Sequence, residues 1–113
     1  MSEPCFKYLH FSNSIRKIHK RYKLTNGKQV MVLETVLTAY EEGTILSVLD
    51  LILSKEIASQ ATLHTITKVL IDLKLIKTEV SKTDARRKYI FPTKLGLSWL
   101  HDCSEVLASS FKK

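Results

Sequence analysis

The hydrophobic positions of the first segment recur at the 3.6-residue spacing of an α-helix. This apolar stripe consists of Phe11, Ile15, Ile18 and Tyr22. The rest of the helical wheel carries most of the cations, namely Arg16, Lys17, Lys20 and Arg21. The pattern predicts an amphipathic basic helix. Its stripe is narrow for a helix that lies on an anionic membrane, and other segments need partners for their own apolar faces. Packing within the protein or its dimer is therefore favoured.

Two further helices are predicted between residues 25 and 53. Thr25 is suited to cap the first of them and Gly43 to end it. The buried stripe of this helix is predicted at Val30, Leu33, Leu37 and Tyr40. Thr44 is then expected to cap a short helix over residues 45–53. That segment is so apolar that it must be covered on most sides.

A fourth helix is predicted over residues 60–74, with Ser59 as its N-cap. Its inner stripe is Leu63, Ile66, Leu70 and Leu73. Its outer face carries short, hydrogen-bonding side chains and no acid before Asp72, and consists of Gln60, Ala61, Thr62, His64, Thr65 and Lys68. An ordinary exposed helix more often carries Glu–Lys pairs. The missing acids favour a helix that enters the major groove of DNA, where a phosphate backbone comes close.

Two short β-rich runs follow, over residues 75–80 and 88–91. The polar stretch between them predicts a hairpin with a basic tip, carrying Lys82, Arg86, Arg87 and Lys88. Pro92 ends the second run, because proline cannot sit within the ladder of a central strand. Thr93 is suited to cap a last helix with Leu100, Cys103, Leu107 and Phe111 on one stripe.

Charge is concentrated in two parts of the chain. The 113 residues carry a net charge of +7, and 44% of them are hydrophobic, which is typical of one compact domain that needs no disulfide or metal. Residues 1–28 hold seven Lys/Arg against one acid, and residues 77–94 hold six against two. Either stretch can be an ordinary solvated surface, but two separate basic patches suit a polyanion.

The predicted order of elements describes a mainly α-helical fold with a small β-hairpin, a winged helix-turn-helix. The chain resembles the MarR-type winged-helix regulators in several short motifs. Leu24-Thr25 with Gln29 resembles the opening of that family's second helix, and residues 57–64 resemble its helix-turn-helix corner. Residues 70–76 resemble its L-x-x-x-G-L-I exit. Residues 84–88 and 93–96 are similar to its D-x-R-x-[RK] wing and T-x-x-G helix start.

The sequence departs from this resemblance at Lys74, which stands where glycine is usual. That turn is therefore either strained or built differently, because a residue with a Cβ resists a positive φ. The chain is also shorter than typical members, in the terminal helices to which the resemblance assigns dimerisation.

The resemblance implies a cytoplasmic, homodimeric transcriptional regulator that binds double-stranded DNA at a palindromic site. Residues 1–113 then form one winged-helix domain, with residues 45–74 as the helix-turn-helix and 75–93 as the wing. Residues 1–23 and 97–113 are expected to make the dimer contacts, because they hold many large apolar groups, namely Phe6, Leu9, Phe11, Ile15, Trp99, Leu100 and Phe111.

The expected recognition-helix contacts are Ser59, Gln60, Ala61, Thr62, His64, Thr65 and Lys68. The expected wing contacts are Lys82, Arg86, Arg87 and Lys88, with Asp84 orienting the arginine. A second function stays open, in which the winged helix is a protein-interaction or replication-accessory module that does not read DNA sequence.

Other chemistry has little support in the sequence. Cys5 and Cys103 lack a C-x-x-C spacing and no signal-peptide pattern precedes them, which indicates a reduced cytoplasmic protein. Together with His10 and His101 they match no zinc motif, so no metal or other cofactor is expected. Cys103 lies on an apolar stripe, which favours an inert thiol over a redox switch. No nucleophile with a base, paired carboxylates or phosphate loop indicates an enzyme, no apolar run reaches a membrane span, and a small-molecule effector is left open.

Overall fold

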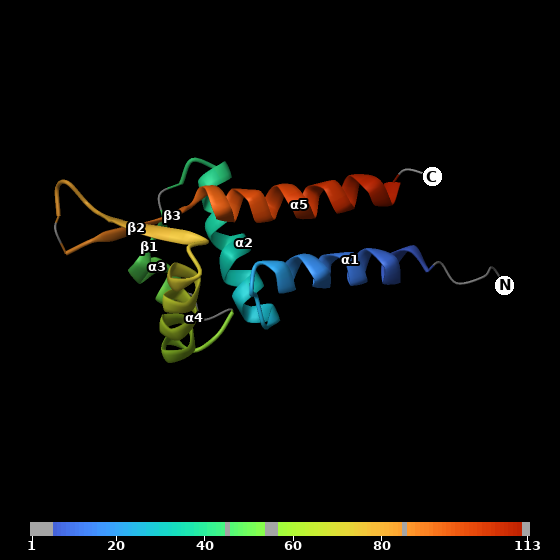
Figure 1. Ribbon diagram of the computed structural model, residues 1–113. Helices are drawn as coiled ribbons and strands as arrows, with labels where there is room; N and C mark the ends of the chain where they lie inside the picture. Colours follow the sequence, from blue (N-terminus) through green and yellow to red (C-terminus); the bar gives the residue numbers. More distant parts are fainter. Residues whose placement is uncertain (1–5, 45, 54–56, 85, 112–113) are drawn as a thin grey trace.

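The computed structural model describes residues 6–44, 46–53, 57–84 and 86–111. In chain order the elements are α1 (Lys7–Arg21), α2 (Gly27–Glu41), β1 (Leu46–Ser47), α3 (Val48–Ile52), α4 (Gln60–Asp72), β2 (Ile76–Val80), β3 (Lys88–Pro92) and α5 (Lys94–Phe111) (Figure 1). The strands form one antiparallel sheet in the order β1-β3-β2. The mainly helical winged fold expected from the sequence is confirmed.

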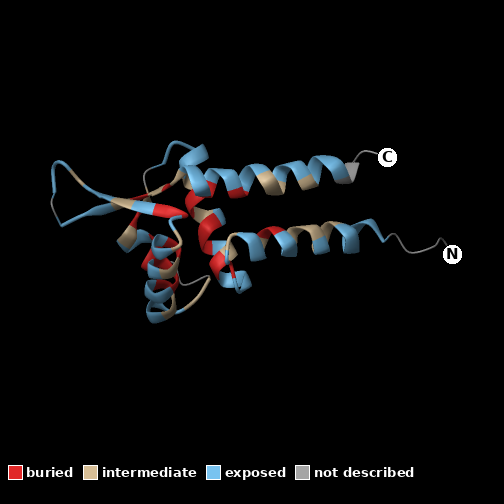
Figure 2. Ribbon diagram, in the orientation of Figure 1, coloured by how far each residue is buried: buried red, intermediate tan, exposed pale blue. Residues whose placement is uncertain are grey.

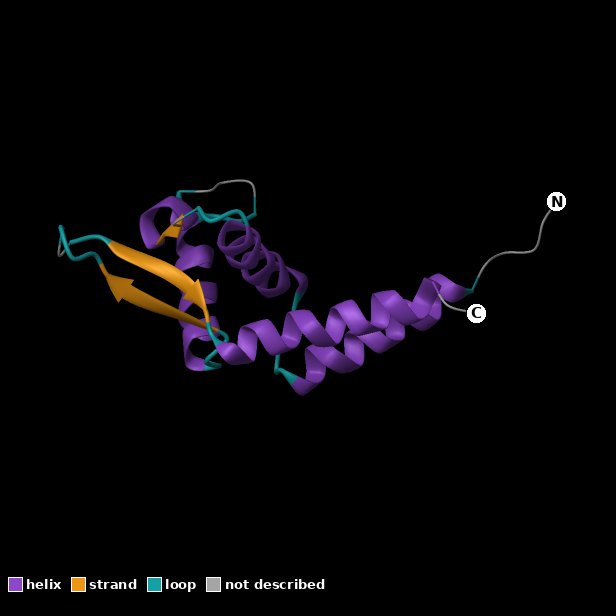
Figure 3. Ribbon diagram, turned by 90° about the horizontal axis from the view of Figure 1, so that it is seen from above, coloured by secondary structure: helices purple, strands orange, loops and turns teal. Residues whose placement is uncertain are grey.

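The molecule is elongated, with extents of 59 × 26 × 24 Å. Its radius of gyration is 16.2 Å, whereas a compact chain of this length has one of about 13 Å. Helices α1 and α5 lie side by side and extend away from the body, opposite the β2–β3 hairpin (Figures 1 and 3). The start of α1 and the end of α5 therefore lie far from the wing (Figure 1).

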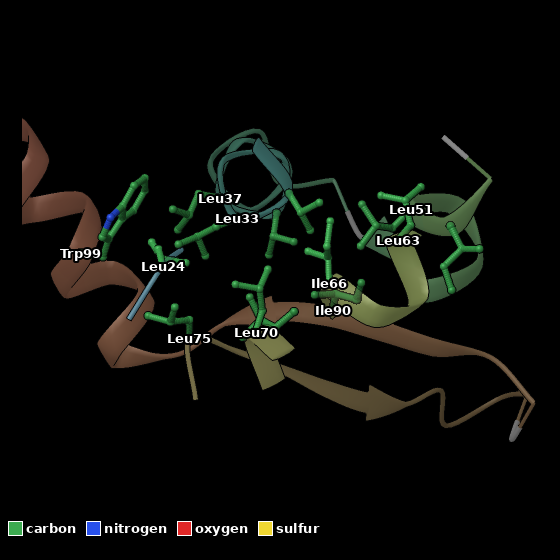
Figure 4. Packing of buried hydrophobic residues seen from close by; sticks show 14 of the residues in the cluster. Leu24, Leu33, Leu37, Leu51, Leu63, Ile66, Leu70, Leu75, Ile90 and Trp99 are labelled. Carbon is green, nitrogen blue, oxygen red and sulfur yellow. The ribbon is translucent and has the colours of Figure 1, made fainter. Parts of the chain in front are cut away.

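The core lies where α2, α4 and the sheet meet, as the red segments of Figure 2 and the side chains of Figure 4 show. The fully buried large side chains are Leu33, Leu51, Leu63, Leu70, Leu75, Ile76, Val32 and Val36. In α4 the predicted stripe is buried, with Leu73 packed at its edge. Tyr40 is 53% exposed, so its predicted core position is wrong. Leu49 and Leu53 are also exposed, because α3 lies at the molecular surface and is covered on one side only.

Two predicted helix caps lie at different residues. Asn26, not Thr25, caps α2: its side-chain oxygen accepts the Gln29 N–H at 2.9 Å. Thr25 instead donates its N–H to the Gln29 side chain at 2.7 Å. Ser47, not Thr44, caps α3 by accepting the Asp50 N–H at 3.0 Å. Each cap lies further along the chain than predicted, because the residues before it belong to the turn that precedes α2 or to strand β1.

Strand β1 is a third strand that the predicted hairpin lacks. Leu46 and Ser47 pair with Ile90 and Tyr89 of β3, which makes β3 the central strand. Pro92 is the last residue of this central strand and pairs with Ile76, so the prediction that it ends the strand is confirmed. Proline is tolerated there because β1 covers only the middle of β3 and requires no N–H from Pro92.

Three helices end in the same left-handed turn. In α1 the Leu24 N–H reaches the His19 carbonyl and Lys23 takes φ of 64°; in α4 the Leu75 N–H reaches the Leu70 carbonyl and Lys74 takes φ of 64°. Gly43, with φ of 72°, ends α2 in the same way, so its predicted role as a stop is confirmed. The sequence leaves open whether the turn at Lys74 is strained or built differently. The structure has the strained turn, with a positive φ at Lys74.

The start of α5 packs on the turn that follows α4. Thr93 caps α5, as predicted, by accepting the Gly96 N–H at 3.1 Å, and its hydroxyl donates to the Lys74 carbonyl. Gly96 is buried, and a Cβ built there would overlap the carbonyl oxygen of Leu75. Glycine is therefore required for α5 to approach the turn that follows α4.

Helix α1 is fixed to α5 near its C-terminal end. The Tyr22 hydroxyl donates to Asp102 at 2.6 Å, and Arg21 contacts the same carboxylate at 3.3 Å. One turn earlier, His19 stacks on Trp99 with ring centroids 5.9 Å apart. Trp99 is 2% exposed and belongs to the core, so it is not among the apolar groups left over for a dimer.

Candidate nucleic-acid interface

The predicted recognition residues lie on the N-terminal two thirds of α4. Gln60, Ala61, His64, Thr65 and Lys68 are exposed, and Thr62 is half-buried. Positions 60, 64 and 68 follow each other at four-residue steps and so form one stripe. Their side chains make no hydrogen bond or ion pair within the described part of the chain. This stripe is available to an external partner.

Ser59 and Thr62 are tied into the helix start. The Ser59 side-chain oxygen accepts the Thr62 N–H at 3.3 Å, and the two hydroxyls lie 3.0 Å apart. The Thr65 hydroxyl donates to the Ala61 carbonyl at 3.2 Å. Of the seven predicted residues, Gln60, His64 and Lys68 thus keep the most polar capacity for a ligand, while the others shape the helix surface.

The basic tip of the hairpin is exposed as predicted. Lys82, Arg86, Arg87 and Lys88 all lie in solvent. Asp84 accepts the backbone N–H of Arg86 at 3.0 Å, whereas its carboxylate is 3.8 Å from the Arg86 Nε and the guanidinium side chain is 96% exposed. The carboxylate therefore fixes the backbone of the turn more firmly than it fixes the guanidinium.

The wing and the helix-turn-helix are connected through β1. A hollow of about 460 Å³ lies between them, and it is lined by Ser47, Val48, Leu49, Asp84, Arg86, Arg87 and Lys88. Strand β1 pairs with β3 at the base of the wing and continues directly into α3. The sheet therefore joins the base of the wing to the start of α3. This connection is not predictable from the sequence, since a two-residue strand leaves no periodic signal.

A pocket of about 590 Å³ lies between α1, α2 and α5. It is lined in part by His19, Glu34, Trp99 and Cys103. Burial lowers the pKa of His19, and the charge of Glu34 opposes this shift. Burial, with the charges of Asp102 and Glu34, raises the pKa of Cys103 to about 11. The Nε1 of Trp99 is buried and has no hydrogen-bond partner among the described residues.

No short motif identifies the residues of this pocket, because they come from three helices far apart in the sequence. The zinc set discussed for the sequence includes Cys5, which lies outside the described residues. Within the residues that are described, no group of three or more His, Cys, Asp or Glu is arranged to hold a metal ion. No helix in that same part of the chain is long and apolar enough to cross a membrane.

No protein-family model matches the sequence, and no curated protein matches it. Solved structures do match. The MepR–DNA complex from S. aureus superposes with a TM-score of 0.75 at 19% identity, covering 92% of this chain and 76% of MepR. The heme sensor PefR, in complex with heme and carbon monoxide, gives 0.62 at 21%, covering 90% and 69%. The transcriptional regulator Tm0710 from Thermotoga maritima gives 0.65 at 16%, covering 87% and 65%. The chain therefore has the winged-helix fold of the MarR-family regulators.

Proposed function

We propose that this protein is a sequence-specific, double-stranded DNA-binding regulator that acts as a homodimer on a palindromic site. The observation that carries the proposal is the exposed stripe of Gln60, His64 and Lys68 on α4, next to a basic wing. No carboxylate lies in the first turn of this helix. The match to MepR, solved as a DNA complex, supports the same conclusion at the level of the fold.

Helix α4 supplies the contacts to base edges. A glutamine side chain can pair with the N6 and N7 groups of adenine, and a threonine methyl can pack on the thymine methyl. Gln60, His64 and Thr65 provide these groups on one face, and Lys68 neutralises a phosphate at its edge. Ser59, Ala61 and Thr62 are short, so the backbone of the helix start can approach the DNA closely.

The wing supplies contacts that do not depend on base sequence. Lys82, Arg86, Arg87 and Lys88 contact the backbone or the minor groove that flanks the recognition site. Asp84 holds the backbone of the turn so that the arginines point outward.

The dimer is proposed to form through α1 and α5, because several large apolar side chains in and next to these two helices are exposed. These include Phe6, Leu9, Leu100 and Leu107. Phe11 and Ile15 are half-buried, and the side chain of Phe111 lies outside the described part of the chain. Two copies related by a twofold axis present two recognition helices, which accounts for a palindromic site.

The test of base recognition compares one selected site with random duplex DNA. Replacing His64 or Thr65 by Ala is expected to cost about 1–3 kcal/mol on the selected site and little on random DNA. Equal losses on both sequences would limit α4 to phosphate contacts. Indifference of the unmodified protein to any DNA, with specific capture of a protein, would favour the interaction-module alternative.

The test of the wing uses the salt dependence of binding. The Arg86→Ala/Arg87→Ala double variant is expected to weaken binding to all sequences and to flatten the slope of log affinity against log salt by roughly one to two units. Asp84→Ala is expected to weaken binding as well, and Asp84→Asn separates the two roles of this residue. Asparagine keeps the acceptor for the Arg86 N–H, so restored binding assigns Asp84 to the shape of the turn.

The pocket between α1, α2 and α5 supports a regulatory part of the proposal, in which a planar aromatic cation binds there. The aromatic and apolar lining around Trp99 and the carboxylate of Glu34 favour such a ligand, and MepR has been solved with ethidium. Ethidium is expected to quench the fluorescence of Trp99, the only tryptophan. Glu34→Gln is expected to weaken this quenching, whereas Glu42→Gln, outside the pocket, leaves it unchanged. Equal quenching in both variants would remove Glu34 from the site.

A further inference from the structure

A second basic surface lies on the opposite side of the fold from the wing and is not used by the proposed recognition helix. It is a hollow of about 770 Å³ between α1 and the first turn of α2. We call it the α1–α2 groove, and its polar lining includes Arg16, Lys17, Lys20, Thr25, Asn26 and Gly27.

The cations of the α1–α2 groove have no anionic partner in the described part of the chain. Arg16, Lys17 and Lys20 are exposed, and Lys20 lies three residues after Lys17 and four after Arg16, so it is a neighbour of both on one face of α1. Arg21, the next cation, is by contrast paired with Asp102. No carboxylate lines the groove, and residues 4–33 contain no Asp or Glu. The positive charge of this surface is therefore uncompensated.

The opposite wall of the groove adds hydrogen-bond donors. The N–H groups of Gly27 and Lys28 begin α2 and have no intrahelical acceptor, since Asn26 caps the N–H of Gln29. The positive end of the helix dipole lies at the same place. No atom lies within 4 Å of a Cβ built on Gly27, so an anionic group can approach this backbone closely.

The turn between the two walls carries a further cation. Lys23 occupies a left-handed position with φ of 64°, a conformation that favours glycine. Its side chain is exposed, and the next residue, Leu24, lines the groove. Lys23 therefore adds a further positive charge to this surface, although its backbone conformation favours glycine.

We propose that the α1–α2 groove binds the phosphate backbone of the same DNA duplex that α4 reads. This proposal rests on the proposed function. Helices α2 and α4 pack against each other, and in Figure 1 their first turns both lie toward the lower edge of the molecule, where we place the duplex. Phosphate oxygens are suited to the groove because they accept hydrogen bonds from N–H groups and ion pairs from Arg and Lys together.

A membrane surface fits the groove less well. A helix that lies on a membrane needs exposed apolar side chains beside its cations. In α1 the residues next to the groove cations, Ile15 and Ile18, pack against the core instead. The exposed apolar residues Tyr8 and Leu9 lie at the other end of the helix.

The experiment compares two double variants that lose the same charge. Arg16→Gln/Lys20→Gln removes cations from the groove, and Lys7→Gln/Lys94→Gln removes exposed cations from outside it. The groove variant is expected to bind random duplex DNA several-fold more weakly and to flatten the salt slope by about two units, at 0.9 per lost phosphate contact. The control variant is expected to change both quantities little.

A single substitution separates binding from folding. Gly27→Glu places an acid in the first turn of α2, where it favours the helix, but it puts a negative charge into the groove. DNA affinity is therefore expected to fall while the unfolding temperature holds or rises, and Gly27→Gln is expected to retain more affinity than Gly27→Glu.

The outcomes distinguish this proposal from the proposed function. If the two double variants bind DNA equally well while the Arg86→Ala/Arg87→Ala variant binds weakly, the groove proposal fails and the proposed function stands. If the unmodified protein binds no DNA but binds phosphatidylglycerol vesicles, and the groove variant does not, both fail and the groove is a membrane site.

Discussion

The hydroxyl of Tyr22 donates a 2.6 Å hydrogen bond to the carboxylate of Asp102 and joins the end of α1 to α5. This bond raises the pKa of Tyr22, since it favours the protonated hydroxyl. Tyr22→Phe is expected to lower the free energy of unfolding by about 1 kcal/mol, measured by urea denaturation. In a cycle with Asp102→Asn the two losses are expected to be less than additive. Strict additivity would mean that the bond contributes nothing to stability.

Gly96 and Gly27 form a matched pair for substitution by alanine. At Gly96 a Cβ would overlap the Leu75 carbonyl, so Gly96→Ala is expected to destabilise the protein by about 2 kcal/mol or more. At Gly27 the space is open, and Gly27→Ala is expected to leave stability unchanged or to raise it by less than about 1 kcal/mol. Thermal unfolding of the two variants measures the difference, and equal effects would contradict the close approach of α5 to Leu75.

Lys74 and Gly43 occupy equivalent turns at the ends of α4 and α2. Because Lys74 has φ of 64°, Lys74→Gly relieves backbone strain and is expected to raise the free energy of unfolding by up to about 1 kcal/mol. The reverse change at the other turn, Gly43→Ala at φ of 72°, is expected to lower it by about the same amount. A loss of stability in Lys74→Gly would show that the lysine side chain makes a compensating interaction.

The pKa of His19 predicts a pH dependence of stability. Burial lowers this pKa below 6.5, and the opposing charge of Glu34 does not restore it. The unfolded chain therefore takes up a proton before the folded chain does, and stability is expected to fall as the pH drops below about 6.5 towards the lowered value. His19→Gln is expected to flatten this part of the stability profile. An unchanged profile would assign the pH dependence to other histidines.

The thiol of Cys103 is expected to react slowly. Its pKa of about 11 lies two units above the ordinary value of 9.0, which means about a hundredfold less thiolate near pH 8. In a Cys5→Ser variant, alkylation by iodoacetamide is expected to be slow in the folded protein and fast in urea. A fast reaction in the folded protein would restore the redox-switch hypothesis that the sequence analysis disfavoured.

The helices that pack one stripe against the core were predictable from the sequence, and the exceptions have local causes. Leu63, Ile66 and Leu70 are buried at the predicted spacing because α4 is long enough to show its period. Strand β1 was not predictable, since Leu46 and Ser47 are extended only because Tyr89 and Ile90 pair with them. Tyr40 follows the period of α2 but lies beyond the elements that would cover it.

The candidate interface was predictable as a set of residue types, but its internal bonds were not. The exposure of His64 and Arg86 agrees with the sequence pattern. That Asp84 holds the Arg86 N–H more firmly than the guanidinium depends on the shape of the turn, which the sequence does not specify. Trp99 was counted with the terminal apolar groups because its partner His19 lies 80 positions away.

Because Gly96 has no Cβ, α5 can lie close to the carbonyl of Leu75. This close approach has a mechanical consequence for the proposed dimer. Helix α5 is 18 residues long, about 27 Å, so a swing of about ten degrees about this contact displaces its far end by about 5 Å. If the far ends are held together in the dimer, the same swing moves the two recognition helices apart or together. Half-sites on DNA repeat at about 34 Å. In the proposed dimer, the angle at Gly96 therefore sets the spacing of the half-sites that the two copies can span.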